Sequence, residues 1–242
     1  SNILNDGGSF KNGATSSSNS AQPMPATLLR FTSSVARTET RGILYNTQVA
    51  DRGWIGGIGE VIGLAATSST SDRQKIEGYL AHKWGLTGNL PSANPYKHSL
   101  ANQPKISMSS IGTNSVNVSA DLIDLGGAST SLAVMFAEAN GTVLETPETI
   151  SSLQLWLDAA DSSTIAHTSN LASQWNDKSG NGYHATAASG QEPSTGSSTI
   201  NGKNVLTWSL GKKMKRATPS GANWQDVYVV GQWTGGATFD ND

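Results

Sequence analysis

The stretch S-D-R-Q-K-I-E-G-Y-L-A-H-K-W-G-L, residues 71–86, decides the fold. Ser71 is in position to act as an N-cap, and Gln74 follows three residues later, as a capping box requires. Gly85 offers a left-handed stop at the other end. Apolar side chains recur at helical spacing on one face of this stretch: Ile76, Tyr79, Leu80 and Trp84. The pattern predicts one amphipathic helix of about four turns.

The rest of the chain has the pattern of short β-strands joined by polar turns. Runs of aliphatic and β-branched residues bounded by Gly, Asp or Pro are typical of strands. They occur at residues 27–33, 41–45, 58–64, 153–158 and 224–233. The sequence therefore predicts an all-β fold decorated by a single helix.

Composition limits the functions that this chain can have. Its 242 residues carry a net charge of -2, so nothing in the overall charge attracts nucleic acid or an anionic membrane. The absence of cysteine excludes disulfides and thiolate metal sites. No apolar run approaches the roughly 20 residues of a membrane-spanning helix, so membrane insertion is not expected.

The middle of the chain, residues 101–146, differs in composition from both flanks. Alternation of apolar and polar residues is clear at 116–120 and 132–137, which predicts strands. This segment resembles the first half of an immunoglobulin-like or fibronectin type III-like module. Such a module has about seven strands, and this segment has room for only three or four, so we interpret it as a partial, small Ig-like β segment.

Two motifs in the last third of the chain resemble the beginning of a laminin G-like (concanavalin A-like) jelly-roll domain. They are L-W-L-D-A-A-D at residues 155–161 and Q-W-N-D-K-S-G-N-G-Y-H-A at residues 174–185. G-E-V-I at 59–62 and the helix at 72–86 resemble the end of the same domain. The order is therefore permuted, and the resemblance, of the type found in bacterial surface repeats, divides the chain into three parts. Residues 1–100 are the C-terminal half, 101–146 the Ig-like segment and 147–242 the N-terminal half.

The permuted order implies that each half alone is an incomplete β-sandwich with open strand edges. Open edges favour pairing with another chain. One interpretation is that residues 147–242 of one unit complete a sandwich with residues 1–100 of the next, in a head-to-tail polymer or tandem array. The alternative is that the two halves meet within one chain, as in a circular permutant.

The sequence gives no indication of catalysis, and no catalytic residues are expected. Some concanavalin A-like folds are glucanases with paired carboxylates on one strand, but no E-x-D-x-x-E pattern occurs here and Glu60 stands alone in its strand. The four histidines show no H-E-x-x-H pattern.

Calcium is the one candidate cofactor, because laminin G-like domains often hold Ca²⁺ through carboxylates and carbonyls on loops. Calcium takes six to eight oxygen ligands, so the candidate ligands come from several loops. They are Asp158, Asp161, Asp177, Asp240 and Asp242. The alternative is that these residues form turns and cap strands.

Sugar binding is the other common role in this family, and aromatic rings beside turns could stack on a glycan. The candidates are Trp54, Tyr183, Trp224 and Trp233. The alternative is that most tryptophans belong to the core, since aromatic residues dominate sandwich packing. We assign Trp84, Trp156 and Trp175 to the core.

Together these patterns predict a non-enzymatic structural or adhesive repeat unit of an extracellular or cell-surface bacterial fibre. Its expected partners are copies of itself, with polysaccharide as a further candidate and no nucleic acid. The alternative is a carbohydrate-binding, lectin-like module of a larger secreted protein.

Overall fold

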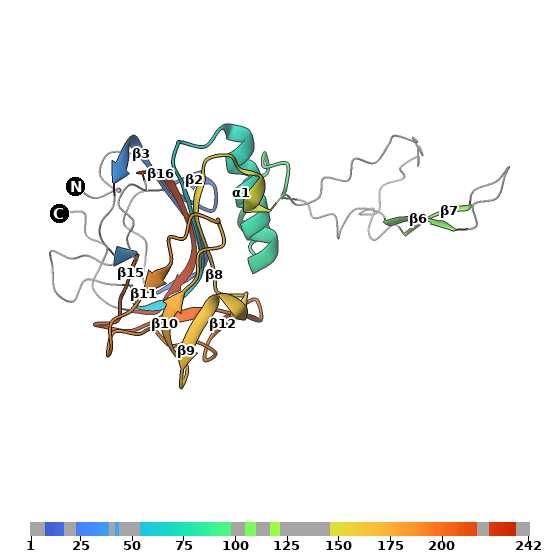
Figure 1. The fold of residues 1–242 in the computed structure, drawn as a ribbon. Helices are drawn as coiled ribbons and strands as arrows, with labels where there is room; N and C mark the ends of the chain where they lie inside the picture. The colour runs from blue at the N-terminus through green and yellow to red at the C-terminus, as the bar shows by residue number, and fades with distance from the viewer. Residues whose placement is uncertain are drawn as a thin grey trace.

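The computed structural model describes residues 8–16, 23–38, 42–43, 54–97, 105–109, 117–121, 146–216 and 223–235. These residues are mostly β-strands in antiparallel sheets with a single α-helix, α1 (Thr70–Trp84). The coarse prediction of an all-β fold with one helix is therefore confirmed (Figure 1). In this part of the chain, no helix is both long and apolar enough to cross a membrane.

The largest sheet has seven strands in the described part of the chain, with the path β14-β5-β16-β3-β1-β2 and with β8 also paired to β5. Its strands are β1 (Ser9–Lys11), β2 (Ala14–Thr15), β3 (Met24–Thr38), β5 (Gly56–Leu64), β8 (Leu153–Asp158), β14 (Leu206–Trp208) and β16 (Asn223–Trp233).

A second sheet, of five strands, has the order β4-β15-β11-β10-β9. Its strands are β4 (Gly42–Ile43), β9 (Ile165–Thr168), β10 (Leu171–Trp175), β11 (Ala185–Thr186) and β15 (Met214–Arg216). Two short hairpins complete the strands: β12 (Thr199–Ile200) with β13 (Lys203–Asn204), and β6 (Lys105–Ser109) with β7 (Asn117–Asp121). Single 3-10 turns are η1 (Thr87–Asn89), η3 (Pro147–Thr149) and η4 (Ser162–Thr164).

The two outer parts of the chain meet within one chain and share the largest sheet. Strand β16, from the last part, lies between β3 and β5, which both come from the first part. The other edge of β5 pairs with β8 and with β14, again from the last part. Of the two interpretations given above, the structure therefore has the one in which the two outer parts meet within one chain.

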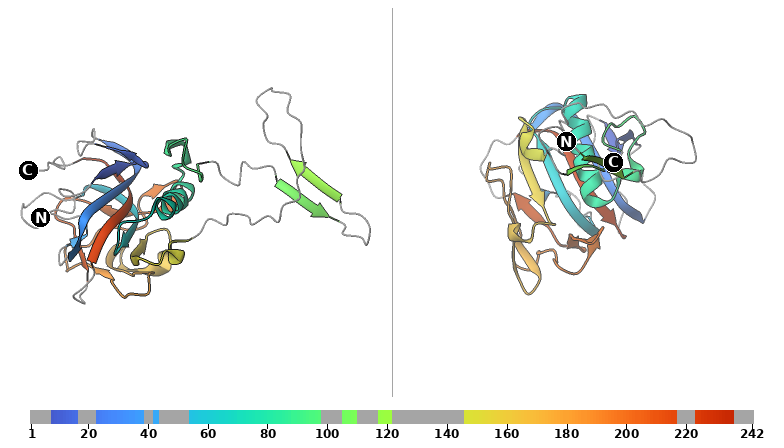
Figure 2. Two further views of the ribbon diagram at one scale, coloured as in Figure 1. Left: turned by 90° about the horizontal axis from the view of Figure 1, so that it is seen from above. Right: turned by 90° about the vertical axis from the view of Figure 1, so that its right-hand side faces the viewer.

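Strand β5 is buried along its whole length because both faces of the sheet are covered. A register shift at Gly59 places one extra residue in β5, a β-bulge that reverses which face the side chains take. Ile58 and Val61 consequently pack toward the five-stranded sheet, whereas Ile62 and Leu64 pack toward α1. Glu60 lies two and four residues before Ile62 and Leu64, so its side chain also faces the helix. Figure 2 shows α1 lying against the sheet.

Helix α1 confirms the main features of the predicted helix and corrects its start. The N-cap is Ser69, whose Oγ accepts from the Asp72 backbone N–H, so the cap lies two residues before the predicted one, Ser71. Gly85 ends the helix in the left-handed conformation, as expected. Of the predicted apolar face, Ile76, Leu80 and Trp84 are buried; Tyr79 is half-buried.

The strand predictions in the middle segment are met only where the structure describes it. Strand β7 matches the alternation predicted at 116–120, and it pairs with β6 in an antiparallel hairpin. The strand predicted at 132–137 lies outside the described residues. The hairpin establishes local β-structure and leaves the Ig-like resemblance a prediction.

Candidate functional site

The most unusual group in the described residues is a carboxylate buried under the helix. Glu60 is 0 % exposed and lies on β5 with its carboxylate directed at α1. Its Oε1 accepts from Tyr79 Oη at 3.0 Å and from Trp156 Nε1 at 2.7 Å. Its Oε2 accepts from Trp84 Nε1 at 2.7 Å. Three donors from one helix and one neighbouring strand therefore converge on a single side chain.

Lys83, on the last turn of α1, connects Glu60 to a second buried carboxylate. Its Nζ lies 2.9 Å from Glu60 Oε2 and 2.7 Å from Asp158 Oδ1. Glu60 and Asp158 are directly opposite each other in the β5–β8 ladder, which explains how one ammonium reaches both. The lysine side chain is 16 % exposed and that of Asp158 5 %, so water has little access to the contact.

Burial raises the pKa of the Glu60 carboxyl, and nearby Asp158 raises it further, whereas the Lys83 ammonium and the Trp84 N–H act in the opposite direction. Burial, helped by the same two carboxylates, also raises the pKa of the Tyr79 phenol, so this hydroxyl stays protonated and donates. We refer to Glu60, Lys83 and Asp158 as the carboxylate–lysine cluster.

A second lysine continues the chain of charges toward the surface. Lys178 Nζ lies 3.2 Å from Asp158 Oδ2 and 2.9 Å from Asp161 Oδ2, and 4.3 Å from the centroid of the Trp156 ring. Burial alone would lower the pKa of Lys178, but its hydrogen bond to Asp161 and the charge of Asp158 outweigh burial and raise it. Hydrogen bonds from Ser163 and Lys178 lower the pKa of Asp161.

The loop at residues 176–182 closes the outer edge of β8. Asp177 Oδ1 accepts from the Trp156 backbone N–H at 2.9 Å, and the Lys178 N–H donates to the Trp156 carbonyl at 2.8 Å. Ser179 Oγ donates to the Gln154 carbonyl, and so does Asn181 Nδ2. The two motifs that resemble the start of a jelly-roll domain are thus joined physically, one as a strand and the other as the cover of its edge.

The structure places three of the five candidate calcium ligands, and their oxygens are engaged by protein donors. Asp158 and Asp161 come together around Lys178, so an ammonium occupies the space between them. Both oxygens of Asp177 accept hydrogen bonds, from Trp156 N, Ser179 N and Oγ, and Tyr183 N. Within the described ranges there is no group of three or more acidic or histidine side chains suited to a metal ion. Asp240 and Asp242 lie outside the described residues.

Three of the four rings proposed to stack on sugars lie in the core. Trp54 is 1 % exposed, Trp224 6 % and Trp233 5 %, and the rings of Trp54 and Trp233 pack on each other with centroids 5.7 Å apart. A buried ring cannot offer its face to a glycan, so the assignment of these three is wrong. Only Tyr183 is half-buried. The predicted core residues Trp84, Trp156 and Trp175 are confirmed, each at most 3 % exposed.

A second buried ion pair fixes the same helix-facing side of the sheet. Arg30 on β3 contacts Asp226 on β16 through two hydrogen bonds of 2.9 Å, from Nε to Oδ1 and from Nη2 to Oδ2. The Ser68 backbone N–H adds a third donor to Asp226, just before the helix. Burial alone would lower the pKa of Arg30, but its hydrogen bond to Asp226 outweighs this and raises it.

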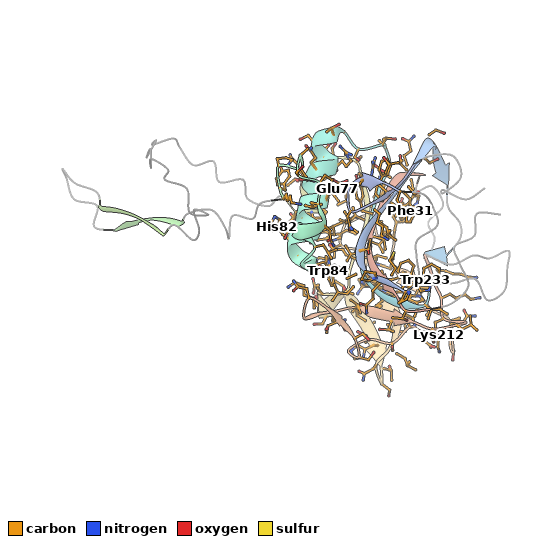
Figure 3. All side chains as sticks on the ribbon, turned by 180° about the vertical axis from the view of Figure 1, so that it is seen from behind. Phe31, Glu77, His82, Trp84, Lys212 and Trp233 are labelled. Atoms are coloured by element: carbon orange, nitrogen blue, oxygen red, sulfur yellow. The ribbon has the colours of Figure 1, made fainter. Side chains whose placement is uncertain are left out.

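Glu77 is a further buried carboxylate, on the sheet-facing side of α1, and it is only partly satisfied. Asn94 Nδ2 donates to its Oε2 at 3.1 Å, whereas its Oε1 has no hydrogen-bond partner in the described structure. Burial raises the pKa of Glu77, against the attraction of Arg73 and Arg30. Figure 3 shows Glu77 and Trp84 on the helix, with Phe31 and Trp233 beyond the sheet.

These arrangements do not provide an open hydrolytic site. Glu60 and Asp158 are a carboxylate pair that the sequence does not reveal, because they lie 98 positions apart in the chain. Retaining hydrolysis needs two carboxylates flanking a bound sugar, and here a lysine lies between them and the burial of both excludes a polysaccharide. The signal that could have indicated the cluster is a carboxylate in each of two largely apolar strands, Glu60 within β5 and Asp158 at the end of β8.

No family model matches this chain, and neither does any curated protein or solved structure.

Proposed function

We propose that this chain is a non-enzymatic structural or adhesive unit of an extracellular or cell-surface fibre, folded as a permuted laminin G-like jelly roll. The observation that carries the proposal is the interleaving of strands from the first and last parts of the chain in one sheet. The most prominent aromatic rings and carboxylates support it, because they are buried and hold the fold together. The lectin-like alternative loses three of its four candidate residues for the same reason.

The interleaved sheet suggests how units could join head to tail. Without β16, strands β3 and β5 would each have an open edge, separated by the width of one strand. Without the last part of the chain, β5 would also lose β8 and β14. If the last part of one unit paired in the same way with the first part of the next, the same edges of β3 and β5 would be covered. Exchange between copies would therefore need no new kind of contact. Heterologous exchange of this kind propagates into a filament.

An engineered disulfide tests whether β5 pairs with β8 of its own chain or of a neighbour. Val61 and Leu157 are directly opposite across these strands, and the chain has no natural cysteine. The variant Val61→Cys/Leu157→Cys should give a ladder of disulfide-linked multimers on a non-reducing gel if units assemble by exchange. The single variant Val61→Cys is the matched control for random oxidation.

Light scattering coupled to size-exclusion chromatography of the wild-type chain gives the complementary measurement. We expect oligomers that grow with concentration and are visible as filaments by electron microscopy. A monodisperse monomer at every concentration, together with a purely intramolecular disulfide in the double variant, would reject assembly by strand exchange.

A further inference from the structure

The carboxylate–lysine cluster has the composition and geometry of a site for covalent bond formation. We propose that the Lys83 side chain condenses with the Asp158 carboxyl group to form an intramolecular amide, an isopeptide bond, with Glu60 carrying the protons. This modification would join helix α1 to strand β8, and thereby the first part of the chain to the last. It does not depend on the fibre role proposed above: in units joined by strand exchange, the same two groups would meet between neighbouring chains, and the bond would link those chains.

The two reacting groups are already in contact. Lys83 Nζ lies 2.7 Å from Asp158 Oδ1, and both side chains are largely buried. Lys83 belongs to α1 and Asp158 to β8, and the packing of these two elements keeps the side chains in contact. Fixing two reactants at contact distance removes most of the entropic barrier to a bimolecular step.

Glu60 is placed to carry protons between these groups. Its Oε2 lies 2.9 Å from Lys83 Nζ, on the same ammonium that contacts Asp158. Complete burial favours the neutral form of a carboxyl group, which makes Glu60 a ready acceptor for a proton from the lysine. The two indole N–H groups and the Tyr79 hydroxyl hold the carboxylate in place while this proton comes and goes.

The surrounding donors indicate that Asp158, and not Glu60, is the carboxyl that reacts. Asp158 Oδ2 lies 3.2 Å from the Lys178 ammonium, and Oδ1 accepts from the Ala160 backbone N–H at 3.1 Å. A cation and a backbone donor on the same carboxyl stabilise the negative charge that develops on its oxygens during attack. Glu60 is held by two indoles and a phenol and lacks this second cation.

The reaction balances without any further reagent. The Lys83 ammonium first gives one proton to Glu60, which leaves a neutral amine. The amine nitrogen attacks Cγ of Asp158, and a C–N bond forms. One more proton from nitrogen and the proton held by Glu60 both pass to one Asp158 oxygen, the C–O bond breaks, and water leaves. Nitrogen keeps one hydrogen as an amide, and Glu60 returns to its carboxylate.

Burial supplies the driving force for a condensation that bulk water opposes. A buried ammonium and carboxylate carry a large desolvation cost, and the product replaces both charges by a neutral amide. The released water moves from an apolar site to solvent. The aromatic side chains of Tyr79, Trp84 and Trp156 around the cluster keep other water from returning to hydrolyse the bond.

The other buried ion pair provides an internal contrast. Arg30 and Asp226 are also close, buried and contributed by the two outer parts of the chain. A guanidinium is always protonated and has no free amine to attack a carboxyl group. Only the pair built with lysine can therefore form the amide.

Intact mass spectrometry of the purified full chain, denatured before measurement, tests the proposal directly. We expect the loss of one water molecule per chain, in a monomer if the two parts meet within one chain and in a covalently linked multimer if they are exchanged between chains. Peptide mapping with trypsin should then give one branched peptide joining the stretches around Lys83 and Asp158, with no cleavage after Lys83. A mass equal to the unmodified sequence, or a branch at Lys178, would overturn the proposal.

Four variants assign the roles. Lys83→Arg keeps the positive charge beside both carboxylates but removes the nucleophile, so its mass should be that of its sequence. Glu60→Gln should also stay uncondensed, because the amide cannot carry the proton. Lys212→Arg makes the same substitution at a lysine outside the cluster, whose Nζ donates to the Gly190 carbonyl, and should still lose one water.

Asp158→Asn gives the most specific result, because attack on its amide expels ammonia in place of water. The amide product is identical to that of the wild type, so both chains should converge on one mass. If the wild-type chain and Lys83→Arg have both lost one water, the modification lies elsewhere in the chain. That result would reject the assignment to Lys83 and Asp158. Circular dichroism of Lys83→Arg verifies that the variant folds.

Discussion

The two faces of the seven-stranded sheet are packed by different chemistry. The face toward the five-stranded sheet is filled by apolar and aromatic side chains such as Val61, Leu157 and Val229. The face toward α1 is also largely apolar, but it contains the Arg30–Asp226 pair and the carboxylate–lysine cluster. Both ionic groups join the first part of the chain to the last.

This difference shows how the two layers are positioned. Apolar burial is non-directional, so it holds layers together without fixing one register. Charge-assisted hydrogen bonds require partners at defined distances and angles. The helix is therefore held at one position by Glu60 and Asp158, and the strand β16 by Arg30. The five-stranded sheet on the opposite face is held by buried apolar area and by the complementary shapes of its side chains.

The largest expected effect comes from breaking one buried charge pair. Asp226→Ala should lower the free energy of unfolding by about 3–5 kcal/mol, because Arg30 is left buried without its partner. Urea denaturation followed by tryptophan fluorescence measures the change.

The matched control replaces both charges. Arg30→Met/Asp226→Leu removes the pair without leaving an unpaired ion, and it should lie much closer to the wild type than Asp226→Ala does. If single and double variants lose the same stability, the charges on this face are not coupled.

On the apolar face, the expected effect is smaller and comes from crowding. A Cβ added at Gly63 would lie 2.1 Å from Cζ3 of Trp224, so Gly63→Ala must displace the indole. Overpacking of this kind costs about 1–3 kcal/mol. Gly88→Ala is the control, because nothing lies within 4 Å of its added Cβ. Equal melting temperatures for the two variants would contradict the close packing of Trp224 on β5.

The start of the helix on the charged face predicts a contrast between two serines. Ser69→Ala removes the N-cap oxygen that accepts from the Asp72 N–H at 3.0 Å, and a lost cap costs about 1 kcal/mol. Ser71→Ala, inside the first turn, should change stability little. Chemical denaturation of both variants distinguishes them, and the reverse order would restore Ser71 as the cap.

Glu77 adds a pH dependence to the charged face. Burial raises its pKa in the folded chain, and nearby Asp226 acts in the same direction. The attraction of Arg73 and Arg30 and the hydrogen bond from Asn94 lower the pKa but do not outweigh burial. A raised pKa means that the folded state binds this proton more tightly than the unfolded chain does. The resulting stability is complete below the unfolded pKa and is lost as pH rises through the folded value.

Glu77→Gln removes this dependence, because its side chain is neutral throughout. From about pH 5 to about pH 8, the stability of the variant should therefore rise relative to the wild type. Glu148→Gln makes the same change of charge on an exposed side chain and controls for net charge. A constant difference between Glu77→Gln and wild type across this range would mean that Glu77 has the same proton affinity in both states.

The local pattern of the sequence was enough to place most elements. The helix and the strands at 58–64, 153–158 and 224–233 were found because their periodicity is long and their ends carry Gly, Asp or Pro. The cap was misplaced by two residues because residues 68–71, S-S-T-S, offer several hydroxyl groups. Tertiary contacts select among them: Asp226 binds Ser68, and the next residue, Ser69, caps the helix.

The sites were harder to predict because residue type does not reveal burial. Trp54, Trp224 and Trp233 lie beside turns in the sequence, as exposed rings often do, but the folded sheets close over all three. Asp158 and Asp177 have the spacing of loop ligands, but their oxygens are directed at lysine and backbone donors from other strands.

The sequence alone determined the helix and most strands, because these follow from short-range periodicity; the incompleteness of the two outer parts was an expectation from the resemblance to a known family. Only the tertiary structure decided that the two parts complete one sheet and that Glu60, Lys83 and Asp158 come together. Their contact depends on the β5–β8 register and on the bulge at Gly59, which turns Glu60 toward the helix. Pairing between distant strands has no periodicity in the sequence, so no local pattern could have shown it.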